Sequence, residues 1–230
     1  MTFKQVAVVV EGQCERDFLQ SVVAPSLGNK NIFLTAAVIG KPGHKGGNVT
    51  FERLLKDVEN FFSQGNCHAV SMMIDYFRLH PQWPGMPELT QRIHAGASLT
   101  LQEKAQKLSV ATLQAVQQAL PQVKDIEQRF IPYIQMHEYE ALLFSEQQRL
   151  AQCLGIEESK IQHVLAQYET PEHINTNPQR APAKQIESLI SPRKYRKRRD
   201  GVAIAQKIGL YTMREQCKLF NAWVERLECA

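Results

Sequence analysis

The apolar run at residues 6–10 constrains the fold of this chain more than any other feature, because it holds four valines and one alanine without interruption. Such a run is typical of a strand that is buried on both faces, as in a parallel sheet. Similar runs follow at 32–39 and 69–74, and segments with helical periodicity lie between them at 17–27 and 51–62. This alternation predicts βαβ units and an α/β fold with a mainly parallel sheet flanked by helices.

The remaining sequence predicts a fourth strand and two helical regions. The strand covers residues 130–136, and Pro132 favours a position at the edge of the sheet because proline cannot donate a ladder hydrogen bond. We expect an α/β domain at 1–145, with a helical insertion at about 85–125. Residues 146–230 change to short polar helices, expected at 157–168, 183–190, 201–208 and 211–227, and we expect them to form a basic, helical C-terminal cap packed on that domain.

The composition is that of a globular protein, with 43% hydrophobic and 22% charged residues. No apolar stretch reaches the roughly 18 residues that a membrane helix needs, and Glu11 and Glu15 interrupt the apolar N-terminal region before it resembles a secretion signal. We therefore expect a cytoplasmic protein without a membrane partner. The five cysteines are far apart and form no CxxC pair, which argues against a disulfide framework or a structural zinc site.

Acidic residues follow three of the predicted strands. Glu11 comes directly after the first strand, and Glu15 lies one helical turn further on. Asp75 directly follows the third strand, and the pair Glu138 and Glu140 follows the fourth. Because the carboxyl ends of parallel strands meet at one edge of a sheet, we expect these five carboxylates to lie together. Carboxylates brought together repel one another unless a cation joins them.

This pattern predicts a site for Mg²⁺ or Mn²⁺, since hard oxygen ligands suit these ions better than zinc. One or two such ions activate water and neutralise a leaving oxygen in metal-assisted phosphodiester cleavage. Structural explanations remain open, because Glu15 is also favoured in a first helical turn and Asp75 is also a common helix cap. Glu138 and Glu140 likewise suit the first turn of a helix. His137, beside them, is open as a ligand, a proton shuttle or a structural group.

Basic residues gather in the C-terminal region, where six lie within seven positions around Tyr195. They are Arg193, Lys194, Arg196, Lys197, Arg198 and Arg199. Such a cluster suits a polyanion such as nucleic acid, because neutralising phosphates releases counterions. The alternative is a solvated basic turn on the surface.

Two other features suit an anionic substrate. The glycine-rich loop at 41–48 carries Lys41 and Lys45, and its backbone N–H groups can approach a phosphate. The loop lacks the Walker A pattern, so no nucleotide-hydrolysing site is predicted there. Lys184, on a predicted helix after Pro182, could supply a cation to the scissile phosphate. A flexible loop and an ordinary surface lysine are the respective alternatives.

Several segments resemble known sequences. The stretch VVVEGQCERDFL resembles the first motif of Toprim domains, an apolar strand followed by E-G-x-x-E. Over nearly its full length, the chain resembles the DUF4276 family, which is described as Toprim-like. The segments that carry this second resemblance are VEGQCERDFLQSVVAPSL, KPGHKGGNV, MMIDYFRL, YIQMHEYEALLFS, PEHINTNPQRAPAKQIESL and YRKRRDGVAIAQKIGL.

The resemblance implies a Toprim-like, Rossmann-type fold with a Mg²⁺-dependent nuclease site. By motif, Glu11 is then the leading catalytic carboxylate and Asp75 a metal ligand, and the two glutamates after the fourth strand complete the acidic set. Lys184 and Lys197 match positions where the family tends to carry basic residues. Family members are similar to Toprim partners of ABC-type or AAA-type ATPases in phage-defence systems, which implies an ATPase partner and a role in abortive infection. The standard second Toprim motif is D-x-D, and Phe77 stands here in place of its second aspartate.

Three functions compete on this evidence. The first is a metal-dependent nuclease acting on DNA or RNA, the effector of a two-component defence system with an ATPase partner. The second is a non-catalytic Toprim-like module that binds an ATPase or nucleic acid, which the missing second aspartate favours. The third is phosphoryl transfer on a small phosphorylated molecule, against which the basic cluster argues. We expect the first.

Overall fold

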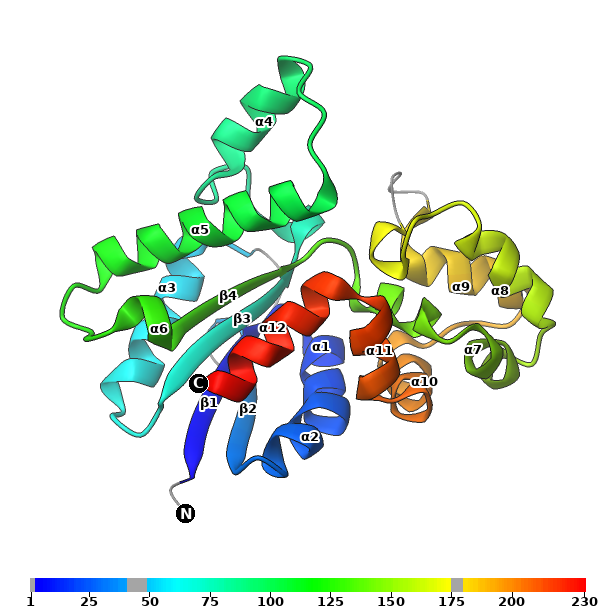
Figure 1. Cartoon of the computed structure of the whole chain (residues 1–230), viewed down its shortest axis with the longest axis horizontal. Helices are drawn as coiled ribbons and strands as arrows, with labels where there is room; N and C mark the ends of the chain where they lie inside the picture. Colours follow the sequence, from blue (N-terminus) through cyan, green and yellow to red (C-terminus); the bar gives the residue numbers. More distant parts are fainter. Residues whose placement is uncertain (1–2, 41–48, 175–179) are drawn as a thin grey trace.

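The computed structural model describes residues 3–40, 49–174 and 180–230. At its centre is a parallel sheet of four strands in the order β2-β1-β3-β4 (Figure 1). The strands are β1 (Lys4–Val10), β2 (Ile32–Val38), β3 (Ala69–Asp75) and β4 (Phe130–Gln135). All four predicted strands are confirmed, and the all-parallel pairing with flanking helices confirms the α/β class.

Helical segments surround this sheet and make up most of the described chain. In chain order they are α1 (Gln13–Phe18), η1 (Leu19–Val23), α2 (Ala24–Gly28), α3 (Phe51–Ser63), η2 (Tyr76–Arg78), α4 (Met86–His94), α5 (Leu101–Ala119), α6 (Ile126–Arg129), η3 (Tyr139–Ser145), α7 (Gln147–Leu154), α8 (Glu158–Leu165), η4 (Pro171–His173), α9 (Pro182–Ile190), η6 (Lys197–Gly201), α10 (Val202–Ile208), α11 (Leu210–Gln216) and α12 (Lys218–Cys229). Helices α4 and α5 occupy the region of the expected insertion, and α4 projects away from the sheet (Figure 1). Among the described helices, none combines the length and apolar character needed to span a bilayer.

Strand β1 is buried on both faces, as its apolar run predicts. Val6, Val8 and Val10 belong to the core on one face, which is built with α1, η1, α2, α10 and α12. Ala7 and Val9 belong to the core on the other face, which is built mainly with α3 and α5. The central position of β1 places its carboxyl end in the middle of one edge of the sheet, where the chain turns into Glu11.

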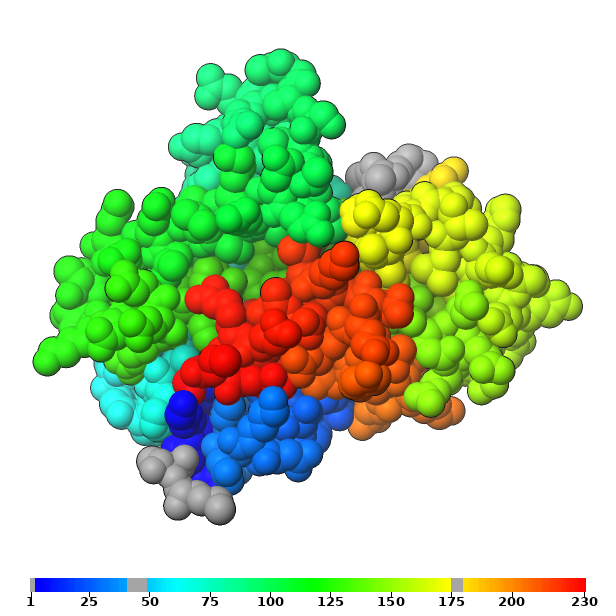
Figure 2. Space-filling view, viewed as in Figure 1, coloured from blue at the N-terminus to red at the C-terminus, as the bar shows by residue number. Residues whose placement is uncertain are grey.

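Strand β4 lies at the edge of the sheet, as Pro132 predicts, yet all of its residues are buried. The C-terminal helix α12 covers it, with the ring of Trp223 stacked on Tyr133 at a centroid distance of 4.6 Å. The indole N–H of Trp223 donates to Ser71 Oγ at 2.8 Å, and that hydroxyl donates to the carbonyl of Ile131 at 2.5 Å. In Figure 2 the C-terminal helices (orange and red) lie between the N-terminal helices (blue) and the segment around α5 (green). The end of the chain therefore completes the core of the sheet.

One helix that the sequence predicts is divided into two helices in the structure. The pattern at 211–227 predicts a single helix, but the structure has α11 and α12, with Cys217 in an extended conformation between them. The cause is distant in sequence, because the carboxylate of Glu172 accepts hydrogen bonds from the backbone N–H groups of Leu219 and Phe220 at 3.0 and 2.9 Å. A carboxylate that satisfies free N–H groups stabilises a helix start at that point.

Candidate active site

The five carboxylates that the sequence predicts to meet do come together at the carboxyl edge of the sheet. They are Glu11 after β1, Glu15 in α1, Asp75 at the end of β3, and Glu138 and Glu140 after β4, and we call them the acidic cluster. Their proximity is evident in Asp75: burial raises its pKa well above the usual range, and the charges of the other four carboxylates raise that pKa further. The parallel topology therefore assembles the cluster from three separate strand ends.

Two members of the cluster have pKa values near or above neutrality. Burial and the neighbouring charge of Glu15 raise the pKa of Glu11 to about 7, although the guanidinium of Arg78 lies 3.2 Å from one of its oxygens. Burial raises the pKa of Glu140 to about 8, against the opposing influence of Lys197. Shifts of this size, caused by burial and like charges, are common in functional sites.

Three oxygens of the acidic cluster are buried without a hydrogen-bond partner among the described residues. They are Glu11 Oε2, Asp75 Oδ1 and Glu140 Oε1. Buried polar atoms in folded proteins are nearly always hydrogen-bonded, because an unpaired buried group costs free energy. Three such oxygens on neighbouring carboxylates have the donor chemistry that a hard divalent cation requires.

The ammonium group of Lys197, from η6, lies inside this cluster. Its Nζ is 2.5 Å from Glu138 Oε1 and 3.5 Å from Glu140 Oε1. Burial alone would lower the pKa of Lys197, but the charges of Glu140 and Glu138 raise it above its ordinary value. The second oxygen of Glu138 accepts a hydrogen bond from the backbone N–H of Ala183 at 3.0 Å. The sequence predicted Lys197 as part of a basic cluster and as a basic position of the family, but not its pairing with Glu138, which lies 59 positions away.

Lys184 pairs with a residue of its own helix in the structure. Its ammonium lies 3.0 Å from Glu187, one turn along the same helix, and its side chain is 65% exposed. Helix α9 contributes the backbone N–H of Ala183 to the cluster instead of the Lys184 side chain. The role of Lys184 at the scissile phosphate therefore stays a prediction, and among the lysines that the structure describes it is Lys197 that pairs with carboxylates of the cluster.

The other residues predicted to contact phosphate belong to the basic cluster and to the glycine-rich loop. Three arginines of the basic cluster have intramolecular partners: Arg193 with the carbonyl of Leu154, Arg198 with Asp17, and Arg199 with Asp200. Lys194 and Arg196 are exposed. The two lysines of the glycine-rich loop, Lys41 and Lys45, lie outside the described residues.

An aromatic pair borders the acidic cluster. Phe77 lies two residues after Asp75 and is 50% exposed, and its ring stacks on His137 at a centroid distance of 5.7 Å and an interplanar angle of 19°. Burial lowers the pKa of His137 to about 4, with smaller contributions from nearby positive groups, so the imidazole is neutral at neutral pH. The sequence drew attention to Phe77 only as a missing aspartate, and its stacking partner could not be read from the chain.

The arrangement falls short of a preformed metal site. Within the described ranges, no three His, Cys, Asp or Glu side chains are placed so that they could hold one ion together. Lys197 supplies positive charge to Glu138 and Glu140 in this arrangement. Among the described residues, Glu11 Oε2 and Asp75 Oδ1 have no hydrogen-bond partner, and Glu140 Oε1 has only the Lys197 ammonium at 3.5 Å, so these are the atoms that a cation would engage.

The chain was compared with protein families, with curated proteins and with solved structures. No curated protein and no solved structure matches it. The family described as Domain of unknown function (DUF4276) matches residues 10–228, a range that contains the whole acidic cluster, Lys197 and the aromatic pair. The resemblance noted in the sequence is thus confirmed at the level of the family, and the chain belongs to the DUF4276 family.

Proposed function

We propose that this protein is a Mg²⁺- or Mn²⁺-dependent phosphodiesterase of the Toprim type that cleaves nucleic acid. The observation that carries the proposal is the set of buried carboxylate oxygens without hydrogen-bond partners among the described residues, on Glu11, Asp75 and Glu140. A fold stabilised only by its own contacts gains nothing from leaving these oxygens unsatisfied. Burial and the neighbouring carboxylates raise the pKa of Asp75, and a divalent cation would satisfy these oxygens and offset the repulsion between the carboxylates.

The residues of the site suit the chemistry of phosphodiester hydrolysis. If the side chains of Glu11, Asp75 and Glu140 moved from the arrangement described above to bind a divalent cation, that cation would supply Lewis-acid stabilisation of the charge that develops on the phosphate. Glu15 is left to accept the proton of the attacking water, and burial raises its pKa toward the range where a carboxylate exchanges protons efficiently. Lys197 and Arg78 bring positive charge to the cluster, and each can stabilise a phosphate oxygen.

The surroundings of the cluster favour nucleic acid over a small phosphorylated substrate. The exposed face of Phe77, held by stacking on His137, is suited to stack on an unpaired base. Exposed Lys194 and Arg196 add positive charge in the same region of the chain as Lys197. A base-stacking ring beside a carboxylate site fits a single-stranded segment of DNA or RNA.

A second candidate is a non-catalytic module that binds an ATPase partner or nucleic acid. The observation that favours it is the 2.5 Å ion pair between Lys197 and Glu138, which neutralises part of the cluster without a metal. The same resemblance that implies the nuclease also implies an ATPase partner and a role in abortive infection, so both candidates keep these as part of the proposal.

A cleavage assay separates the two candidates. Purified protein is incubated with plasmid DNA and with total RNA in Mn²⁺ or Mg²⁺, beside Glu11→Ala and Asp75→Ala. The matched control is Glu172→Gln, a change at a buried carboxylate outside the cluster whose oxygens both accept backbone hydrogen bonds. We expect cleavage that is abolished by chelator and by both cluster substitutions but retained by the control.

Other outcomes count against the nuclease. Equal cleavage by wild type and by both cluster variants would identify a contaminant and would contradict the assignment of the site. Absence of cleavage by the wild type, alone and after co-expression with an ATPase encoded beside it, would favour the binding module.

A further inference from the structure

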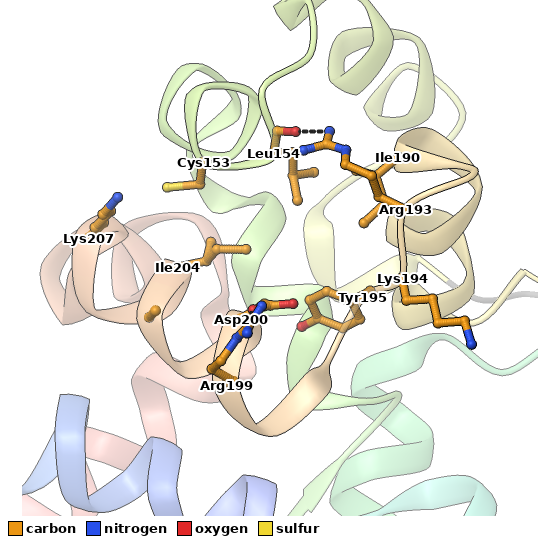
Figure 3. A pocket seen from close by; sticks show the side chains of 11 residues that line it. Cys153, Leu154, Ile190, Arg193, Lys194, Tyr195, Arg199, Asp200, Ile204 and Lys207 are labelled. Atoms are coloured by element: carbon orange, nitrogen blue, oxygen red, sulfur yellow. Dashed lines mark hydrogen bonds and ion pairs between the residues drawn. The ribbon is translucent and has the colours of Figure 1, made fainter.

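A pocket lies between the C-terminal end of α7, the segment after α9, and α10 (Figure 3). Its volume is about 300 Å³. Its charged lining consists of Arg193, Lys194, Arg199, Lys207 and Asp200. Figure 3 shows Arg193 reaching across the pocket to Leu154, with Arg199 and Asp200 on the opposite wall.

The charges that line this pocket do not balance. Asp200 is its one carboxylate, and both of its oxygens accept hydrogen bonds from nearby residues: one from the backbone N–H of Arg196 at 2.9 Å and the other from Arg199 Nε at 2.7 Å. Arg193 donates one of its guanidinium N–H groups to the carbonyl of Leu154, which leaves its other donors available. Asp200 is paired with Arg199, so Arg193, Lys194 and Lys207 have no carboxylate partner in the lining and give it a net positive charge.

The rest of the lining is apolar or aromatic. Ile190 and Ile204 form apolar walls, and the ring of Tyr195 stands next to Asp200 (Figure 3). The hydroxyl of Tyr195 is buried and lies close to the hydroxyl of Tyr139. A pocket that combines apolar walls with a few convergent polar groups is typical of small-molecule sites, and its volume lies at the lower end of their range.

We infer that this pocket binds a small phosphorylated molecule of the nucleoside 5′-monophosphate class. Arg193 and Arg199 can bind the phosphate, since guanidinium groups match phosphate oxygens with paired hydrogen bonds. Ile190 and Ile204 offer the apolar surface that a flat base needs. The inference stands apart from the proposed nuclease activity, because none of these residues belongs to the acidic cluster.

The pocket and the acidic cluster share one short element. Arg199 and Asp200 line the pocket from η6, and Lys197 reaches Glu138 from the same five-residue turn. A ligand held by Arg199 therefore contacts the turn that carries the lysine of the cluster.

Calorimetric titration of the full chain tests the inference. The probes are the four ribonucleoside 5′-monophosphates, adenosine and inorganic phosphate, all in chelator so that metal-dependent chemistry is absent. We expect at least one monophosphate to bind more tightly than adenosine or inorganic phosphate. Lys207→Glu should weaken that binding by about tenfold or more, because it reverses a positive charge in the lining of a pocket that binds an anion, and Ala203→Trp should block the pocket sterically.

A control variant and a folding measurement separate a local loss of binding from a general effect of charge or a loss of the fold. Lys56→Glu makes the same charge change at an exposed position of α3 and should leave binding unchanged. Thermal unfolding without ligand shows whether each variant is folded. Absence of monophosphate binding by the wild type would overturn the inference, as would equal binding by the folded Lys207→Glu and Ala203→Trp variants. Binding of a ten-nucleotide oligomer but of no monophosphate would likewise overturn it and would assign the cations to a polymer.

Discussion

Two buried glutamates in this protein have opposite surroundings. Glu172 is 4% exposed, and both of its oxygens accept backbone hydrogen bonds at the start of α12. Glu140 is 1% exposed, and one of its oxygens has no hydrogen-bond partner among the described residues, with the Lys197 ammonium 3.5 Å away. Burial raises the pKa of both carboxyls, so burial alone does not distinguish them.

The two glutamates differ in their hydrogen-bond donors. The carboxylate of Glu172 accepts hydrogen bonds from the backbone of this chain at the start of α12, and its role is to fix where that helix begins. The carboxylate of Glu140 sits among other acids in the acidic cluster, where the fold leaves oxygens unpaired. A buried carboxylate that lacks hydrogen-bond donors is therefore a stronger indication of a functional site than a buried carboxylate whose oxygens are hydrogen-bonded.

The largest difference between the two glutamates should appear in catalysis. Glu140→Gln should reduce metal-dependent cleavage by more than about 100-fold, above the range typical of a residue that only supports a metal ligand. Glu172→Gln should leave cleavage per folded molecule within a few-fold of wild type. Initial rates on a single-stranded substrate in Mn²⁺ provide the measurement, and equal losses in both variants would erase the distinction.

The stability of the fold should depend on Glu172 and should not require the carboxylates of the acidic cluster. Glu172→Ala removes the carboxylate that satisfies the backbone of α12 and should destabilise the fold by about 2 kcal/mol. Asp75→Asn removes a buried charge that its neighbours repel, so the metal-free variant should be more stable than wild type. Urea unfolding in chelator measures both changes, and a destabilised Asp75→Asn would show that this carboxylate supports the fold.

Local patterns in the sequence were enough to predict the sheet and most of the acidic cluster. The apolar runs identify the four strands, and parallel topology brings Glu11, Asp75 and Glu140 to one edge without further information. Lys197 and Glu172 could not be assigned in the same way, because each acts on a partner more than 40 positions away. The start of α12 shows the same limit: its periodicity continues through Cys217, and only a distant carboxylate breaks it.

The stability of the wild-type protein should also depend on pH through the acidic cluster. The pKa of Glu140 is raised from 4.5 to about 8 in the folded state, so between these values the folded protein retains a proton that the unfolded chain has lost. The free energy of unfolding should therefore fall as pH rises from about 5 to 8, and this slope should level off above that range. Urea unfolding at several pH values in chelator should give a shallower slope for Glu140→Gln, whereas an unchanged slope would assign the dependence to other groups.

The smallest effect is expected at Lys184. Its contact with Glu187 on the surface of α9 is worth only about 0.2–0.5 kcal/mol, so Lys184→Ala should leave both stability and cleavage nearly unchanged. Lys197→Ala should lower cleavage markedly, because it removes the cation inside the cluster. A loss of cleavage in Lys184→Ala as large as that in Lys197→Ala would support the predicted role of Lys184 at the scissile phosphate.

The most direct test of the central claim is binding of Mn²⁺ to the purified protein, measured by isothermal titration calorimetry without nucleic acid. The wild type and Glu172→Gln should bind the ion with similar affinity, and Asp75→Asn should lose that binding, because Asp75 contributes an unpaired oxygen to the cluster. Absence of Mn²⁺ binding by the wild type, or equal binding by Asp75→Asn, would contradict the claim that the acidic cluster is a cation site.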